Sequence, residues 1–132
     1  MKMHTKTANT ADPEKSAGLP LALFVWREMR TVGGVTVFIR DCMAGLPRYG
    51  WRVHLLCTAR PLPGEAAEPG ISYLGCGKDA TRWLARLRVR RLVKKVRPEL
   101  IVFNESVAAH DVYSLLADPL PAVNIMHNCR PD

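Results

Sequence analysis

Two adjacent glycines, Gly33 and Gly34, follow an expected strand at residues 21–28 after a short loop, and an amphipathic segment begins directly behind them. Residues 21–26 are continuously apolar, which is typical of a strand covered on both faces. Glycine allows the backbone to approach a ligand closely, and the unpaired N–H groups at a helix start favour a phosphate or carboxylate. This order of strand, Gly-Gly loop and helix therefore predicts an α/β fold with an anion site at the loop.

The segment behind the glycines repeats apolar residues at helical spacing. These positions are Val35, Phe38, Ile39, Cys42, Met43 and Leu46. All lie on one helical face, so we expect a helix that Pro47 stops or kinks. Further apolar patterns predict strands at 51–58, 71–74, 100–103 and 122–127, and helices at 79–97 and 107–117.

Strands that alternate with helices predict right-handed crossovers and a parallel sheet with helices on both faces. We expect a Rossmann-like open sheet with the strand order 3-2-1-4-5, formed by a single domain over residues 19–132. Residues 1–18 lack periodicity and are interpreted as a flexible N-terminal tail. The chain stops just after the fifth strand, where such a sheet normally continues, and we interpret that ending as a truncation.

Composition excludes several classes of protein. Of the 132 residues 48% are apolar, which excludes disorder over most of the chain. The longest apolar run, at 19–26, is far too short to span a bilayer, and residues 1–18 lack the apolar core of a secretory signal. The four cysteines show no spacing typical of a metal, redox or disulfide site. We therefore expect a cytoplasmic protein without a metal or cofactor.

Polar residues follow three of the expected strands. Gly33 and Gly34 follow the first strand, Asn104-Glu105-Ser106 follows the fourth, and His127-Asn128 follows the fifth. The carboxyl ends of parallel strands are the usual ligand edge, so a shared site is expected there. The alternatives are a tight turn at Gly33-Gly34, a helix cap at Glu105 and a structural, hydrogen-bonded His127.

Two common nucleotide motifs do not match. A dinucleotide fingerprint needs G-x-G-x-x-G directly after the first strand and an acid after the second, where this chain has Thr58-Ala59-Arg60. A P-loop needs Gly-Lys-Ser/Thr, which neither Gly34-Val35-Thr36 nor Gly77-Lys78-Asp79 supplies. Both readings are therefore weak.

Five short segments together resemble the N-terminal domain of family 4 glycosyltransferases of the GT-B fold. They are residues 31–35 (Thr-Val-Gly-Gly-Val), 39–41 (Ile-Arg-Asp), 46–53 (Leu-Pro-Arg-Tyr-Gly-Trp-Arg-Val), 96–102 (Val-Arg-Pro-Glu-Leu-Ile-Val) and 121–128 (Pro-Ala-Val-Asn-Ile-Met-His-Asn). Each segment is a loose match alone, but the five occur in the family's order over roughly residues 20–129. Trp51, where the family often has histidine, and Pro47 within the helix depart from the pattern without removing the resemblance.

The resemblance implies a retaining transfer of a sugar from a nucleotide-sugar donor to a glycan or lipid-linked acceptor. It implies that Gly33 and Gly34 approach the donor phosphates and the acceptor, and that His127 acts as the catalytic contact to the donor sugar. Glu105 and Asn128, at the same edge, are expected to bind substrate. The nucleotide and the family's paired glutamates belong to a C-terminal domain that these 132 residues do not contain. Because both walls of a cleft must stabilise the departing diphosphate, we expect the isolated chain to be inactive.

The positive charge of the chain is concentrated in one expected helix. Residues 82–97 contain eight basic residues and no acid, and without them acidic residues slightly outnumber basic ones. Four residues, Val89, Leu92, Val93 and Val96, share an arc that can pack on the sheet, whereas Trp83, Leu84 and Leu87 point into the basic arc. The expected anion or membrane surface consists of Arg86, Arg90, Arg91, Lys94 and Lys95.

A basic surface that carries Trp and Leu is typical of a helix on an anionic membrane. Such a helix would make this cytoplasmic protein a peripheral membrane protein, bound to the inner face of the membrane. The alternative is a solvated helix that kinks near Leu87 and buries both apolar sets. Nucleic acid is disfavoured, since only charge supports it. Two readings thus compete with an acceptor-binding glycosyltransferase domain: a non-catalytic nucleotide- or anion-binding module, and a basic membrane-surface interaction domain.

Overall fold

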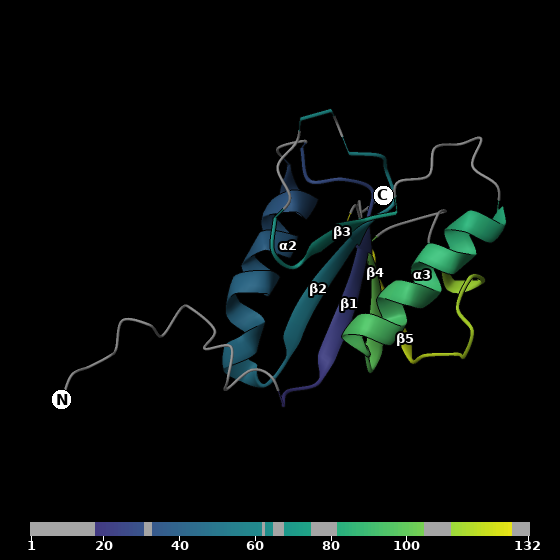
Figure 1. The fold of residues 1–132 in the computed structure, drawn as a ribbon. Coiled ribbons are helices and arrows are strands. Elements are labelled where there is room, and N and C mark those ends of the chain that lie inside the picture. The colour runs from purple at the N-terminus through teal and green to yellow at the C-terminus, as the bar shows by residue number, and fades with distance from the viewer. Residues whose placement is uncertain are drawn as a thin grey trace, which may run out of the picture.

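A computed structural model describes residues 18–30, 33–61, 63–64, 68–74, 82–104 and 112–127. Its five strands are β1 (Leu21–Trp26), β2 (Arg52–Cys57), β3 (Ile71–Tyr73), β4 (Leu100–Asn104) and β5 (Ala122–Ile125). All four neighbouring pairs are parallel, and the order across the sheet is β3-β2-β1-β4-β5. The predicted Rossmann-like α/β fold and its strand order are confirmed (Figure 1).

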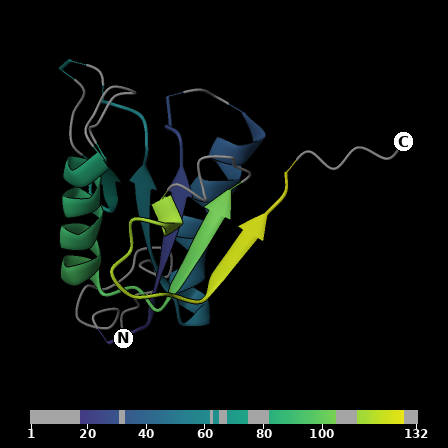
Figure 2. The ribbon, with the colours of Figure 1, turned by 90° about the vertical axis from the view of Figure 1, so that its right-hand side faces the viewer.

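Two helices cover opposite faces of this sheet. The helix α2 (Gly34–Gly45) lies on one face and α3 (Arg82–Val96) on the other, as the two perpendicular views show (Figures 1 and 2). The α-helix ends at Gly45, two residues before Pro47, and the short 3₁₀ helix η2 (Leu46–Tyr49) follows, in agreement with a helix that Pro47 stops or kinks. Gly50 follows with a φ of 91°, a left-handed conformation that glycine adopts without strain.

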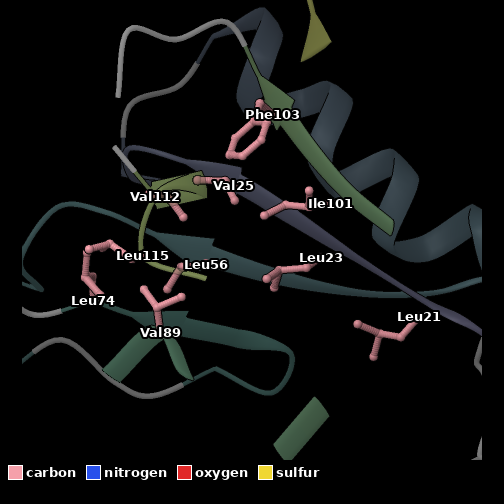
Figure 3. Packing of buried hydrophobic residues seen from close by; sticks show 10 residues of the cluster. All are labelled: Leu21, Leu23, Val25, Leu56, Leu74, Val89, Ile101, Phe103, Val112 and Leu115. Carbon is pink, nitrogen blue, oxygen red and sulfur yellow. The ribbon is translucent and has the colours of Figure 1, made fainter. Parts of the chain in front are cut away.

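Each face of the sheet has its own core. Alternate residues of β1 explain this, because Leu21, Leu23 and Val25 face α3 while Ala22 and Phe24 face α2. Figure 3 shows the α3-side core, to which the segment after β4 contributes. Its ten buried members are Leu21, Leu23, Val25, Leu56, Leu74, Val89, Ile101, Phe103, Val112 and Leu115. The central strand is therefore buried on both faces, as its apolar run predicts.

Three expected elements end two or more residues away from their predicted ends. The first strand, expected at residues 21–28, ends at Trp26. The helix expected at 107–117 begins outside the described residues, and its described part ends in a turn at residues 114–115. Leu115 and Leu116 donate to carbonyls only three residues back, and Pro119 disfavours helix in the residue before it. The fifth strand ends at Ile125 rather than at residue 127, because Ile125 pairs with Asn104, the last residue of β4.

The basic helix matches its prediction over its described length. It was expected at 79–97 and is described from Arg82 to Val96; residues 79–81 lie outside the described part. Its apolar arc packs on the sheet through Val89, which has no exposed surface, together with Leu92 and Val96. Among the described residues, the helices are too short or too polar to cross a bilayer.

Candidate functional site

The carboxyl ends of β1, β4 and β5 lie at one edge of the sheet. The connection after β1 leads into α2 on one face, and α3 returns to β4 on the other face. In an open α/β sheet, this reversal at neighbouring strands leaves a crevice at the carboxyl edge. The sequence-predicted residues Gly33, Gly34 and His127 all follow strands at this edge.

Gly33 is the N-cap residue of α2, and its backbone is extended, with φ −171° and ψ 178°. Its carbonyl oxygen accepts the first helical bond, from Val37 N at 3.0 Å. A methyl group added at Gly33 or Gly34 would meet no heavy atom of the described residues within 4 Å. Neither the backbone conformation nor the packing therefore requires glycine at position 33, and the space beside both residues is open.

Asn104 is the last residue of β4 and has no exposed surface. Its amide Nδ2 donates to the carbonyl oxygen of Val25 at 3.2 Å, and its Oδ1 lies 2.9 Å from Nε2 of His127. The first contact fixes the orientation of the amide, because a backbone carbonyl can only accept. Asn104 thus joins β1, β4 and the segment after β5 through one buried side chain.

His127 also contacts the beginning of α2. Its ring packs edge-on against Phe38, with 5.0 Å between the ring centroids. Phe38 comes four residues after Gly34, and helical side chains tilt toward the N-terminus of their helix. The half-buried His127 therefore lies beside the first turns of α2, and the structure brings together the Gly-Gly loop and the histidine.

The structure also adds positive charge to this edge. Arg30 follows β1, Arg60 follows β2, and the guanidinium of Arg30 donates to the carbonyl oxygen of Arg60 at 3.2 Å. This bond joins the segments that follow two neighbouring strands at their carboxyl ends. Within the described residues, no cluster of three histidine, cysteine or acidic side chains could hold a metal ion. The helix start and the guanidinium of Arg30 are groups that favour negative charge.

Sequence reasoning located part of this site. Glu105 and Asn128 were expected to bind substrate, and both lie outside the described residues. Phe38 was assigned only to the packing face of its helix, and Asn104 was given no role of its own. Asn104 did carry a signal, since it is a polar residue that ends the apolar run 100–103.

The expected basic surface lies on the outer side of α3. Its five members, Arg86, Arg90, Arg91, Lys94 and Lys95, are all exposed, although Nε of Arg90 also donates to the carbonyl oxygen of Leu115 at 3.3 Å. Trp83 is 63% exposed and Leu87 is 37% exposed. The alternative in which the helix buries both apolar sets is therefore wrong for Trp83 and Leu87, whereas Leu84 of the same set is half-buried.

The fold is a Rossmann-like α/β domain, and the carboxyl edge of its sheet carries a Gly-Gly helix start, a half-buried histidine and the side chain of Arg30. The family model of Glycosyltransferase Family 4 matches residues 32–131, well over half of the chain. The chain belongs to this family, and its function is glycosyltransferase-like, with a sugar donor and an acceptor as substrates in general terms. A search of the curated proteins gives no match.

Proposed function

We propose that this chain is the acceptor-binding N-terminal domain of a GT-B glycosyltransferase that transfers a sugar from a nucleotide-sugar donor with retention. The acceptor is a glycan or a lipid-linked saccharide bound at the edge where β1, β4 and β5 end. The observation that carries the proposal is the contact of His127 with Phe38, because it joins the histidine to the Gly-Gly end of α2. The remaining steps follow from what each residue can do there.

In this proposal Gly33 and Gly34 let the donor phosphates and the acceptor approach the backbone. The open space beside both residues supports this role, since a ligand can occupy what no described side chain fills. The start of α2 and the arginines after β1 and β2 favour negative charge at that position. His127 then contacts the donor sugar near the reacting carbon, held from one side by Phe38 and from the other by Asn104.

Transition-state charge on a departing diphosphate must be stabilised by groups fixed on both sides of the cleft. We therefore expect the 132-residue chain to be inactive alone. The test is sugar-nucleotide turnover by the chain alone and then mixed with, or fused to, a C-terminal donor domain of the same family. Turnover only in the combined sample, with retained anomeric configuration of the product, is the expected result.

Two results would contradict this function. Turnover by the chain alone would show that one domain suffices. No turnover in any combined sample of folded protein, together with saturable nucleotide binding by the chain, would favour a non-catalytic Rossmann-like binding module. His127→Ala in an active combined sample should lower kcat by about 100-fold, the usual scale for a lost, well-positioned group at the reacting centre.

A second role is favoured by the outer surface of α3. Trp83 and Leu87 are exposed among arginines and lysines, an arrangement suited to the boundary between headgroups and acyl chains. We propose that this surface docks the domain on an anionic bilayer, as a peripheral protein at the cytoplasmic side of the inner membrane. Such docking would bring a lipid-linked acceptor to the domain.

Flotation with vesicles that contain anionic lipid tests this second role. Arg91→Glu should weaken binding by roughly fivefold or more, since each basic residue near such a surface contributes about 1 kcal/mol. Arg48→Glu is the matched control, because Arg48 is also exposed but lies in η2, beyond the helix on the opposite face. Trp83→Ser should weaken binding without changing its salt dependence.

The comparison of the two charge variants decides the outcome. If Arg48→Glu weakens flotation as much as Arg91→Glu, binding depends on net charge alone and the α3 surface is not the docking site. Equal binding to vesicles of neutral lipid would also exclude the electrostatic role.

A further inference from the structure

Asn104 has two features expected of a residue that determines which ring nitrogen of a neighbouring histidine carries the proton. It is fully buried, and each end of its amide has a defined partner, Val25 on one side and His127 on the other. The carbonyl of Val25 can only accept a hydrogen bond, so the NH₂ end of the amide must face it. The oxygen end then faces His127.

This orientation determines which nitrogen of His127 carries the proton. Oδ1 of Asn104 has lone pairs and no proton, so the ring nitrogen 2.9 Å away must donate. In a neutral imidazole one nitrogen donates and the other accepts, so a proton on Nε2 leaves Nδ1 with its lone pair. Phe38 packs against the ring edge-on and limits its rotation.

We propose that Asn104 is a positioning residue that holds neutral His127 as the single Nε2–H tautomer and leaves Nδ1 as a hydrogen-bond acceptor. The tautomer determines what His127 can bind. Its Nδ1 can accept a hydrogen bond from a hydroxyl group, such as one on a sugar ring, but it cannot donate one to a phosphate oxygen. The assignment of that hydroxyl to a sugar rests on the proposed function, whereas the tautomer does not.

The tautomer can be measured in the chain alone, without any substrate. Nitrogen-15 NMR of the imidazole at alkaline pH, well above the ordinary pKa of histidine, distinguishes protonated from unprotonated ring nitrogens. We expect one tautomer for His127 in the unsubstituted chain, with the proton on Nε2 and a directly detected Nε2–H signal. A mixture of tautomers, or a proton on Nδ1, would overturn the inference.

Two substitutions of Asn104 test whether it sets the tautomer of His127 or only stabilises the fold. Asn104→Leu removes the acceptor and should give both tautomers and a rapidly exchanging ring proton. Asn104→Asp keeps an acceptor oxygen for the ring and should retain the Nε2–H tautomer. Asn124→Asp is the control, since Asn124 is an exposed residue of the neighbouring strand whose amide contacts Met126.

An unchanged single tautomer in folded Asn104→Leu would overturn the inference, because another group would then hold the ring. If Asn104→Leu does not fold, the unsubstituted chain and Asn104→Asp still decide the question. In an active combined sample, Asn104→Leu should lower kcat by roughly tenfold to a hundredfold with little change in KM, and Asn104→Asp should restore part of it. Absence of turnover with a single Nε2–H tautomer would refute the proposed function and leave the role of Asn104 intact.

Discussion

The helices α2 and α3 cover opposite faces of one sheet, yet they differ in which part carries the residues of interest: the N-terminal end in α2 and the outer side in α3. The important part of α2 is its N-terminal end, where Gly33 is the N-cap and Phe38 in the second turn contacts His127. The important part of α3 is its outer side, where exposed basic residues surround Trp83. The comparison shows that the same α/β scaffold fixes a few side chains by specific contacts at one helix end and leaves a broad charged surface exposed along the side of the other helix.

Two arginines of α3, one of them a member of the basic surface, also form hydrogen bonds to neighbouring segments. Nη1 of Arg88 donates to the carbonyl oxygen of Leu74 at 2.7 Å, and Nε of Arg90 reaches Leu115. These two residues join the helix to the chain after β3 and to the segment before β5. On α2, by contrast, the charged Arg40 forms a bidentate pair with Glu68. In both helices, therefore, some charged side chains form hydrogen bonds or an ion pair with neighbouring segments of the chain.

The largest effect is expected from the fully buried residue that each helix contributes to its core. Ile39 of α2 and Val89 of α3 are both fully buried. Ile39→Ala should lower the free energy of unfolding by about 2–5 kcal/mol, through lost burial and a cavity. Val89→Ala removes less side chain and should cost about 2 kcal/mol. Urea unfolding measures both values, and a larger loss for Val89→Ala would show that the α3-side core dominates stability.

A second comparison sets the two glycines that flank α2 and η2 against each other. Gly50 has a φ of 91°, so Gly50→Ala should cost about 1–2 kcal/mol of stability. Gly33 has an extended backbone with open space, so Gly33→Ala should change stability by no more than about 1 kcal/mol. In an active combined sample, however, Gly33→Ala should lower turnover by roughly tenfold or more.

Thermal or urea unfolding and turnover of both glycine variants check this contrast. If Gly33→Ala is as destabilising as Gly50→Ala, the glycine serves the turn and not a ligand. Full activity of a folded Gly33→Ala variant would remove the loop from the substrate site.

The smallest effect concerns pH and arises on the α3 face. Burial, with a smaller contribution from the charge of Lys95, lowers the pKa of His54 from its ordinary 6.5. The unfolded chain therefore binds a proton more readily than the folded chain. The contribution of neutral His54 is fully present above pH 6.5 and is lost as the pH falls through the lower folded pKa.

Urea unfolding at several pH values, with His54→Gln as the comparison, isolates this contribution. The unsubstituted chain should lose more stability on acidification than His54→Gln, and Lys95→Met should reduce the difference slightly. Equal loss in both chains would show that His54 does not contribute to the pH dependence.

Much of the fold was predictable because each element depends on local patterns. The apolar run at 21–26 and the helical spacing from Val35 to Leu46 indicate what is buried, whatever the rest of the chain does. The ends of elements were less predictable. The strand that begins at Ala122 ends with its partner Asn104, and such a limit is set by a neighbouring strand and not by the strand's own residues.

The sequence by itself determined the class of fold, the strand order, the family and the basic character of α3, because periodicity, motif order and charge are properties of the chain. Only the tertiary structure decided that Asn104 holds His127 and that Phe38 packs against it. These residues are far apart in sequence, and they meet because β1, β4 and β5 end at one edge beside the start of α2. A hydrogen bond between distant side chains depends on that arrangement of strands, so no local pattern could predict it.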